Sequence, residues 1–341
     1  MDEHRMLRDV RPHIIFGTPG RLNDHLDKDN ISRYHIRYLI IDEFDKCLEM
    51  GFQAEMQKLI KSLPGLRRRI LLSATNAEQI PQFVNMSKKG TLIDFSEEDQ
   101  QTSERVTLYE VRSPQKDKLE TLCQLLLGFG DESSIVFLNY RDAVERTSHY
   151  LREQGFVTSC FHGGLEQRQR EDALYKFANG SANVLVATDL ASRGLDIPDI
   201  QNIIHYHLPI HLQELVHRVG RTARWDKSGK TFFIVGPEEQ VPPFVDGTVE
   251  SMELTAVSHQ PSAPRMATVY IGKGKKDKIS KGDIVGFLCK KGGLEPSEIG
   301  RIDVTERYAY AAVSREKLSQ VLRLSSGEKI KGVKTVVEPV K

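Results

Sequence analysis

Short, continuous apolar runs alternate with amphipathic stretches through the first 235 residues of the chain. A continuous run of β-branched and aromatic residues is typical of a strand that is covered on both faces. The pattern predicts an α/β fold with a parallel sheet, whose functional residues lie on loops at the carboxyl ends of strands. The predicted strands are 14–16, 38–41, 70–72, 135–138, 184–186, 203–204 and 232–235, and the predicted helices are 53–62, 116–127, 141–154, 165–179 and 212–219.

Two stretches of different composition divide the chain. Residues 96–105 are polar and charged and precede a predicted strand at 106–111, whereas residues 237–264 contain five prolines. A proline-rich stretch cannot be one regular element and is typical of a linker. We therefore predict α/β domains over 1–98 and 106–240, a linker over 241–264 and a C-terminal domain over 265–341.

The C-terminal domain has a different pattern and a different charge. Its predicted order is strand, helix, strand, strand, helix, strand, an α+β layout that RNA-recognition domains share. Residues 265–341 hold 17 Lys and Arg against 9 Asp and Glu, a net charge of +8, whereas residues 1–264 carry −7. A basic module on an acidic body indicates a nucleic-acid-binding unit. A solvated basic face without a partner is the alternative.

Targeting and metal signals are weak. No apolar run approaches the roughly 18 residues of a membrane span, and the polar start is unlike a signal peptide. The four cysteines are scattered without a CxxC pair, so we expect reduced core thiols and no zinc site. These features favour a cytoplasmic protein without a membrane segment.

An acidic pair, Asp42 and Glu43, directly follows the predicted strand at 38–41. A nucleotide hydrolase needs one carboxylate to hold Mg²⁺ and a neighbour to orient or deprotonate the attacking water. Two charges at a strand end are equally common as solvated turn residues.

Three further polar segments follow predicted strands or end a helix. Ser73 and Thr75 could cap a helix, and Gly194 with its polar neighbours could let the backbone approach phosphate or ribose. Arg218 and Arg221 are three apart, so they lie on one side of a helix and could reach the same anion. A solvated face is the simpler interpretation of the arginines when they are taken alone.

Taken together and in order, these segments resemble the DEAD-box ATP-dependent RNA helicases. The resemblance covers essentially the whole chain, with Phe44, Tyr140 and Ala223 replacing the family's usual Ala, Thr and Gly. The segments that carry it are Thr18–Arg21, Asp42–Asp45, Ser73–Thr75, Ile135–Arg141, His162–Arg170, Thr188–Asp196 and His217–Arg224.

The resemblance implies two RecA-like parallel-sheet domains, the first one partial, that use ATP and Mg²⁺. It implies that Asp42 holds Mg²⁺, that Glu43 activates water, and that Arg218 and Arg221 are arginine fingers. The residues implied in coupling are Asp45, Ser73, Thr75 and His217, and those near the nucleotide are Gly194 and Asp196. The implied RNA contacts are Thr18, Pro19, Gly20, Arg21, Arg141, Gly163, Gln167, Arg170 and Thr188.

The C-terminal domain is similar to the DbpA-type RNA-binding domain at 282–286, 299–303 and 308–310. The similarity implies structured RNA, large-subunit ribosomal RNA and pre-ribosomal particles as partners. Aromatics on the central strands of such folds stack on bases, and strand alternation puts Tyr308 and Tyr310 on one face with Tyr270. Plain packing is the alternative for the tyrosines. A basic loop is the other candidate for RNA binding, through Lys273, Lys275 and Lys276.

The 341 residues contain no phosphate-binding string G-x-x-x-x-G-K-[ST]. Gly229-Lys230-Thr231 is a false match, because Arg224 stands in place of the first Gly and the triplet opens a predicted strand. We therefore expect residues 1–96 to be an incomplete domain in which the strand at 38–41 has an unpaired edge. The rival function is an RNA-binding protein without its own ATPase activity.

Overall fold

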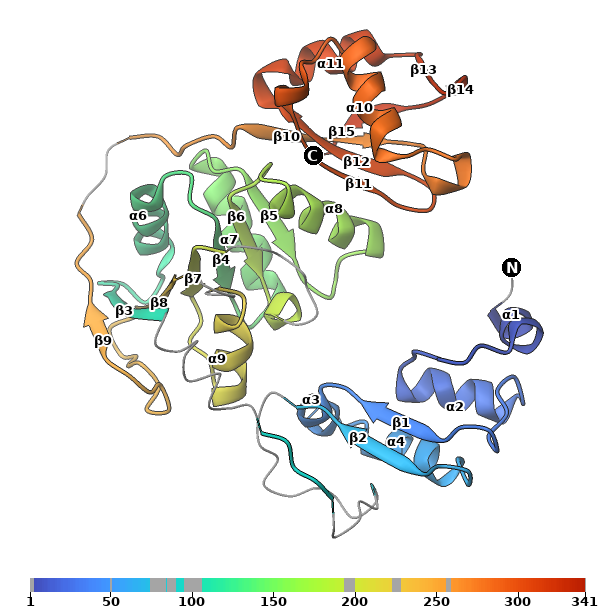
Figure 1. Ribbon diagram of the computed structural model, residues 1–341. Helices are drawn as coiled ribbons and strands as arrows, with labels where there is room; N and C mark the ends of the chain where they lie inside the picture. The colour runs from blue at the N-terminus through green and yellow to red at the C-terminus, as the bar shows by residue number, and fades with distance from the viewer. Residues whose placement is uncertain are drawn as a thin grey trace. The chain divides into compact units, whose positions relative to one another are not determined.

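The computed structural model describes residues 3–49, 51–73, 84, 90–94, 106–192, 200–222, 228–255 and 259–340. The chain divides into two compact units, residues 1–95 and 96–341 (Figure 1). The predicted domain bounds 1–98 and 106–240 stay predictions. The division does not separate the second predicted domain from the third, so that boundary stays a prediction as well.

The first unit contains a two-stranded parallel sheet, β1 (Tyr38–Ile41) and β2 (Arg68–Leu71), in which Ile40 pairs with Ile70. One face is covered, and a small core of Leu26, Ile31 and Leu59 forms where two of the helices meet. The helices among the described residues of this unit are α1 (Glu3–Val10), α2 (Pro19–Asp27), α3 (Phe44–Glu49) and α4 (Gln53–Lys61).

The other face of this small sheet is open. Tyr38 and Ile40 are 61% and 59% exposed, and Ile70 is 42% exposed. Parallel strands normally have both faces covered, and a two-stranded sheet is marginal by itself. The backbone of β1 and β2 is therefore less protected from solvent than the backbone of a buried sheet.

The strand predicted at 14–16 is not formed, so this prediction is wrong. Ile14 and Phe16 are 72% and 93% exposed and lie in irregular chain before α2. A strand needs a neighbouring backbone for its N–H and C=O groups. Among the described residues no strand pairs with this segment, and an apolar run alone does not supply that neighbour.

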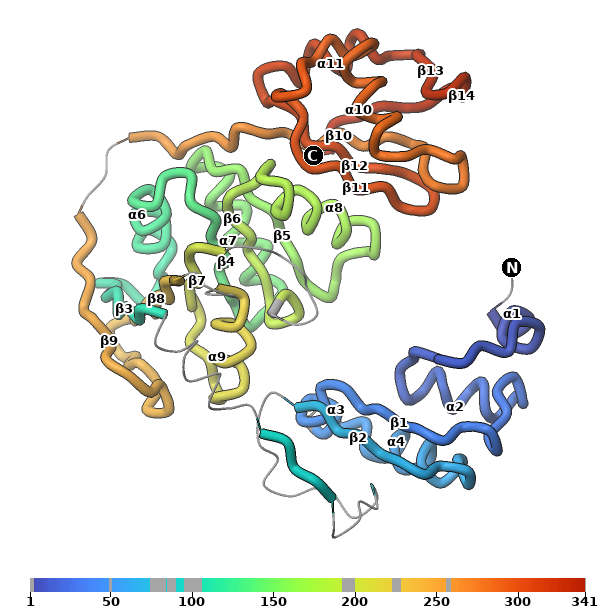
Figure 2. The backbone as a smooth tube through the Cα atoms, in the orientation of Figure 1, coloured from blue at the N-terminus to red at the C-terminus, as the bar shows by residue number. Residues whose placement is uncertain are grey.

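The second unit is built on a seven-stranded parallel sheet with the order β5-β6-β4-β7-β8-β3-β9. Figure 2 shows β9, in the predicted linker, running beside β3 at the edge. The strands are β3 (Val106–Arg112), β4 (Ser134–Phe137), β5 (Thr158–Phe161), β6 (Val184–Ala187), β7 (Asn202–His205), β8 (Gly229–Val235) and β9 (Val249–Ser251).

Helices cover this sheet and complete two apolar cores, one on each face. Val136 and Val186 point into one core, whereas Ile135 and Leu185 point into the other, as the strand period of two requires. The helices are α6 (Leu119–Phe129), α7 (Arg141–Glu153), α8 (Gln167–Ala178) and α9 (Leu212–Val219), with a 3-10 turn η2 (Asp189–Ser192). The predicted parallel α/β architecture is confirmed, although β5 and β9 were not foreseen.

The C-terminal module is an antiparallel sheet with the order β11-β12-β10-β15, covered on one face by two helices. The predicted order of strands and helices is confirmed. Its elements are β10 (Met266–Ile271), α10 (Lys281–Lys290), β11 (Ile299–Val304), β12 (Ala309–Ser314), α11 (Leu318–Ser325) and β15 (Val337–Pro339), with 3-10 turns η3 (Lys275–Asp277), η4 (Pro296–Glu298) and η5 (Arg315–Lys317).

A small hairpin, β13 (Lys329–Ile330) and β14 (Val333–Lys334), precedes the last strand and was not predicted. Lys331 and Gly332 form its tip, both with positive φ, at 50° and 78°. Within the described residues, no helix combines the length and the apolar composition that crossing a bilayer requires.

Hydrogen exchange should distinguish the two sheets. We expect backbone amides of β1 and β2 to exchange faster than those of β4 and β6, because local opening is easier in an open two-stranded sheet than in a buried one. Mass-spectrometric exchange on the purified chain measures this difference. Equal protection of 38–72 and 135–235 would contradict it and would show that the first unit is as well supported as the second.

Candidate nucleotide and RNA site

The acidic loop lies where β1 ends. Glu43 has φ of 48°, in the left-handed region that non-glycine residues rarely adopt. Its N–H donates to Asp42 Oδ1 at 2.9 Å, so the first carboxylate fixes the turn that presents the second. The Phe44 N–H then donates to the carbonyl of Leu72 at 3.0 Å, which ties this loop to the residue before Ser73.

The Phe44 side chain anchors the middle of the loop in the core. Phe44, where the family usually has Ala, is 1% exposed and packs with Met56 and Val84. Asp45 is 6% exposed, and its Oδ1 accepts the Lys46 N–H at 2.9 Å in the first turn of α3. The replacement of Ala by Phe is therefore accommodated in the core and leaves Asp42 exposed at the strand end.

Magnesium would find suitable donor chemistry at Asp42. Mg²⁺ takes oxygen ligands, usually one or two carboxylates together with water and substrate phosphates. The Asp42 carboxylate is exposed, and within the described residues its Oδ1 accepts the Glu43 N–H. The residues present thus fit the ion that the family resemblance implies.

The segment Thr18–Arg21 forms the start of α2. Thr18 is the N-cap residue in extended conformation, and Pro19 and Gly20 open the helix. Arg21 is exposed, but its guanidinium pairs with Glu3 and, at 3.3 Å, with Asp24. A phosphate that binds Arg21 would have to share it with these carboxylates.

The second unit gathers five of the predicted RNA contacts at one edge. Arg141, Gly163 and Thr188 follow β4, β5 and β6, which are neighbours in the sheet. A Cβ on Gly163 would lie 3.7 Å from Nη2 of Arg141, which shows how near the two loops approach. Gln167 and Arg170 begin α8 directly after, and Arg170 Nη2 donates to Gln167 Oε1 at 2.9 Å. The structure brings these residues together, and their contact with RNA stays a prediction.

Arg218 is the most enclosed charged residue of the described chain, at 0% exposed. Its Nε and Nη2 donate to the two carboxylate oxygens of Asp189 at 2.6 and 3.0 Å, and Nη2 also donates to Asn139 Oδ1 at 2.9 Å. Nη1 donates to the carbonyl of His207 at 2.9 Å and contacts His205 Nδ1 at 3.3 Å. All five guanidinium N–H groups are therefore occupied within the protein.

The prediction that Arg218 is an arginine finger is wrong for this structure. A finger must offer N–H groups to a phosphate, and Arg218 has none left, nor any exposed surface. Its guanidinium instead holds together the loops after β4 and β6 and strand β7, with its carbon 5.2 Å from the centre of the Phe137 ring. Helical spacing could not reveal this, because it does not say which of two arginines faces the core.

His205, beside Arg218, is kept neutral. Complete burial, followed by the neighbouring Arg218 guanidinium, holds the pKa of His205 well below its usual value. Its ring stacks on Phe233 with centroids 4.7 Å apart, and Nδ1 faces an Arg218 N–H, so this nitrogen is the acceptor. An added proton on His205 would break the Arg218 network.

Only some of the remaining predicted nucleotide-site residues belong to the described part of the chain. Arg221 and His217 are half-buried at the end of α9, and Ser73 is exposed after β2. Thr75, Gly194 and Asp196 lie outside the described residues. Of the two predicted fingers, the structure leaves Arg221 as the one whose side chain is partly exposed.

The three tyrosines of the C-terminal module form one cluster, so the predicted shared face is confirmed. Tyr270 is the register partner of Tyr310, and ring centroids lie 5.4 to 5.9 Å apart among Tyr270, Tyr308 and Tyr310. Tyr310 is only 1% exposed, since α8 packs on this face. Their role in stacking on RNA stays a prediction.

The basic loop is accessible and larger than predicted. Lys275 and Lys276 are exposed in η3, and Lys273 pairs with Asp277 at 3.2 Å. Lys331 Nζ donates to the carbonyl of Lys278 at 2.9 Å, which brings the β13–β14 hairpin to this loop. Lys278, in the predicted basic loop, is also exposed. Further exposed lysines that the sequence reasoning missed are Lys281, Lys329, Lys331 and Lys334; the net charge of +8 was the signal for them.

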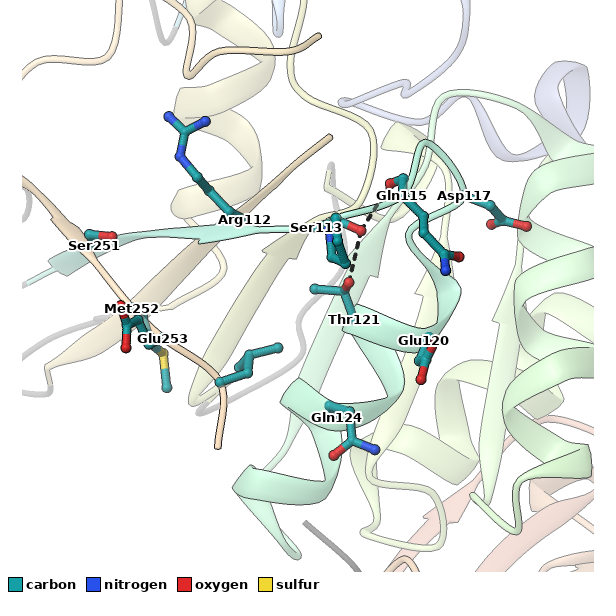
Figure 3. A pocket seen from close by; sticks show the side chains of 12 residues that line it. Arg112, Ser113, Gln115, Asp117, Glu120, Thr121, Gln124, Ser251, Met252 and Glu253 are labelled. Carbon is teal, nitrogen blue, oxygen red and sulfur yellow. Dashed lines mark hydrogen bonds between the residues drawn. The ribbon is translucent and has the colours of Figure 1, made fainter. Parts of the chain in front are cut away.

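Two other features lie apart from these sites. The ligand atoms of His4, Asp24 and His25 lie within 4.8 Å of one another, but Asp24 pairs with Lys28 at 2.7 Å, so this cluster is explained by its own contacts. A cavity of about 550 Å³ lies beside the end of β3 (Figure 3). There Thr121 Oγ1 donates to Ser113 Oγ at 2.8 Å, and none of the predicted site residues lines it.

Removing Arg218 should cost stability. Arg218→Ala leaves the half-buried Asn139 oxygen and the Asp189 carboxylate without their cation, and breaking a buried pair costs about 3–5 kcal/mol, an upper limit here because Asp189 is 31% exposed. Urea unfolding followed by circular dichroism measures the loss. The matched control is Arg112→Ala, at an exposed position on β3, for which we expect less than about 1 kcal/mol. Equal losses for both variants would contradict the structural role of Arg218.

The neutral His205 should make the second unit acid-sensitive. Because its folded pKa lies below the unfolded value of 6.5, the unfolded chain gains a proton first as pH falls. Its contribution is therefore present above pH 6.5 and is lost below it, by up to about 1.4 kcal/mol per pH unit. His205→Gln should flatten the dependence of the urea midpoint between pH 7.5 and 5.5, whereas His259→Gln, at an exposed position, should not. Identical slopes would rule the interpretation out.

Family comparisons agree with the order of these sites. The DEAD/DEAH box helicase family matches residues 1–83, the helicase conserved C-terminal domain matches residues 117–226, and the DbpA RNA binding domain matches residues 268–339. All three parts of the chain thus have a counterpart in one kind of protein.

Individual relatives extend the agreement along the whole chain. The ATP-dependent RNA helicase DbpA of Escherichia coli is 36% identical over 339 residues, which cover 94% of this chain and 71% of that protein. DbpA of Bacillus subtilis is 28% identical over 94% of this chain and 73% of its own length. S. cerevisiae Dbp5 bound to RNA and ADP BeF3 superposes with a TM-score of 0.57 at 26% identity, covering 66% of this chain and 59% of that one. The chain belongs to the DEAD-box family of ATP-dependent RNA helicases.

Proposed function

We propose that the protein couples ATP hydrolysis to the local separation of structured RNA. The observation that carries the proposal is the loop after β1, where Asp42 fixes a left-handed turn at Glu43 and remains exposed itself. Two carboxylates at a strand end can serve as metal ligand and water base. The RNA contacts at the edge of the second sheet and the basic module supply the other half of the activity.

In this proposal the hydrolytic step uses few side chains. Asp42 would hold Mg²⁺, which neutralises charge on the phosphates when bound. Glu43 accepts the proton of the attacking water as the water oxygen bonds to the γ-phosphorus and the bond to ADP breaks. Arg221 supplies positive charge to the transferred group when the two units close, a contribution worth about 10³–10⁵ in rate in related transfers.

RNA would contact both units. Thr18 and Arg21 belong to the first, and Arg141, Arg170 and Thr188 belong to the second. Phosphate contacts of this kind position a strand without reading its sequence. Closing the units around one strand while ATP is bound would bend that strand away from its complement, and hydrolysis would release it.

Ribosomal RNA of the large subunit is the substrate we propose, within pre-ribosomal particles. Support comes from the DbpA RNA binding domain match at 268–339 and from the basic loop at η3. A relative named ATP-dependent rRNA helicase RRP3, from Scheffersomyces stipitis, is 37% identical over 238 residues, 69% of this chain and 49% of that protein. The unpaired cysteines are compatible with the reducing cytoplasm, which we propose as its location.

Replacing Glu43 should separate chemistry from binding. Glu43→Gln keeps the size of the side chain but removes the base, so RNA-stimulated phosphate release from ATP should fall by about 10²-fold or more while RNA affinity stays the same. Malachite-green detection and fluorescence anisotropy measure the two quantities. Glu55→Gln, on α4, is the matched control. Normal turnover in Glu43→Gln would refute the assignment.

The rival function is RNA binding without hydrolysis, which the lack of a P-loop string among the 341 residues favours. It predicts tight binding of structured RNA and no phosphate release above background by the unaltered chain. RNA-stimulated release from that chain would exclude it.

A further inference from the structure

Helix α8 packs on the face of the C-terminal module that carries the tyrosines. The Tyr308 hydroxyl donates to Glu171, and the Tyr310 hydroxyl donates to Asp172. The opposite face of the same sheet packs on α10 and α11 through residues such as Val269 and Ala311. Both faces of the sheet are thus occupied within the chain.

Helix α8 places planar groups against the tyrosines, as the bases of a single-stranded nucleic acid would. The Arg168 guanidinium, a flat cation, lies 4.7 Å from the centre of the Tyr270 ring. The Tyr175 ring lies 4.4 Å from that of Tyr310, tilted by 32°. Stacked bases with anionic oxygens between them would use the same rings and hydroxyls. The helix therefore occupies the positions at which bases would stack.

Polar contacts at the rim hold the module in this position. Asn179 Nδ2 donates to Thr268 Oγ1 at 2.9 Å, and Thr268 Oγ1 bonds to Ser181 Oγ at 2.9 Å. Arg315 Nη2 donates to the carbonyl of Ser181 at 2.9 Å. These contacts join β10 and η5 of the module to the turn after α8, so the covered face belongs to a defined interface.

The tyrosines remain donors in this interface. Burial, followed by the neighbouring carboxylates, raises the pKa of the Tyr308 and Tyr310 hydroxyls above their usual value. Both hydroxyls stay protonated at neutral pH and can donate to Glu171 and Asp172. The two carboxylates would instead repel a phosphate that approached the same hydroxyls.

One side chain connects the interface to the predicted RNA edge. Glu171 Oε1 accepts from Gln167 Nε2 at 2.9 Å, and its other oxygen accepts from the Tyr308 hydroxyl. Gln167 in turn accepts from Arg170 at 2.9 Å. An RNA strand whose phosphates attract Gln167 or Arg170 would break the hydrogen bond between Gln167 and Glu171. Glu171 is also the acceptor of the Tyr308 hydroxyl, so the change would occur beside the interface.

We propose that helix α8 and single-stranded RNA compete for the face formed by Tyr270, Tyr308 and Tyr310, so that α8 is an internal latch on a second RNA site. The proposal deepens the proposed function, since it assumes that the protein binds RNA. Stacking on an aromatic platform tolerates any base, so the ligand is single-stranded RNA of little sequence preference. The exposed lysines near η3 remain accessible in either state.

The test uses the full chain with Tyr308→Phe and Tyr310→Phe combined. This variant keeps both rings for stacking but removes the two hydrogen bonds to α8. If α8 competes, the undocked fraction rises and a fluorescein-labelled 12-nucleotide single-stranded RNA should bind about tenfold more tightly by anisotropy. Tyr109→Phe, on β3 and outside the interface, is the matched control and should leave affinity unchanged. Unchanged or weaker binding by the double variant overturns the proposal.

Two further measurements show whether a change in RNA affinity comes from release of α8. They also separate failure of this proposal from failure of the proposed function. Without RNA, backbone amides of 167–178 should exchange faster in the double variant, while those of β4 stay protected; unchanged exchange overturns the latch. Adding Tyr270→Ser to the double variant should cancel the gain in affinity, and a retained gain overturns the site. If the unaltered chain binds neither structured nor single-stranded RNA, the proposed function fails, whereas the exchange result still reports the docking.

Discussion

The buried guanidinium of Arg218 is the contact on which the described site of the second unit depends. It joins Asn139 after β4, Asp189 after β6 and His205 on β7 to helix α9. Arg141 and Thr188, the predicted RNA contacts, stand within two residues of these partners in the sequence. A buried guanidinium with every N–H group occupied therefore fixes the loops that would meet RNA. It requires a neutral His205, because a protonated imidazole would place a second positive charge beside Arg218 and would leave one Arg218 N–H without its acceptor.

The sequence predicted the parts of the fold that depend on local pattern. The continuous run at 135–138 became β4, and the helix predicted at 212–219 has the observed bounds of α9, because burial on both faces and helical periodicity are visible in a single segment. Pairing is not visible in this way. The apolar run at 14–16 found no neighbour among the described strands, whereas the less apolar segment 249–251 became a strand because the edge of β3 was available.

The same distinction explains the outcome at the site. The position of Asp42 at a strand end and the common face of the tyrosines follow from spacing alone. The burial of Arg218 does not, since it results from acceptors at 139, 189 and 207 that converge only in three dimensions. The covering of Tyr310 by α8 is likewise set by residues about 140 positions away in the sequence, for which the sequence around Tyr310 holds no signal.

Helix α8 serves two surfaces, and this double use limits how each can change. Its first turn carries Gln167 and Arg170 at the predicted RNA edge, and its next turns carry the carboxylates that hold the module's tyrosines. The helix therefore faces the module with the acidic pair Glu171 and Asp172 and with the Arg168 guanidinium, which lies over Tyr270. Replacing Glu171 or Asp172 by a basic residue would strengthen attraction to phosphate at the edge and remove an acceptor for the module's tyrosines. The acidic pair Glu171 and Asp172 is best understood as the part of the helix that keeps the aromatic face covered until a stronger ligand arrives.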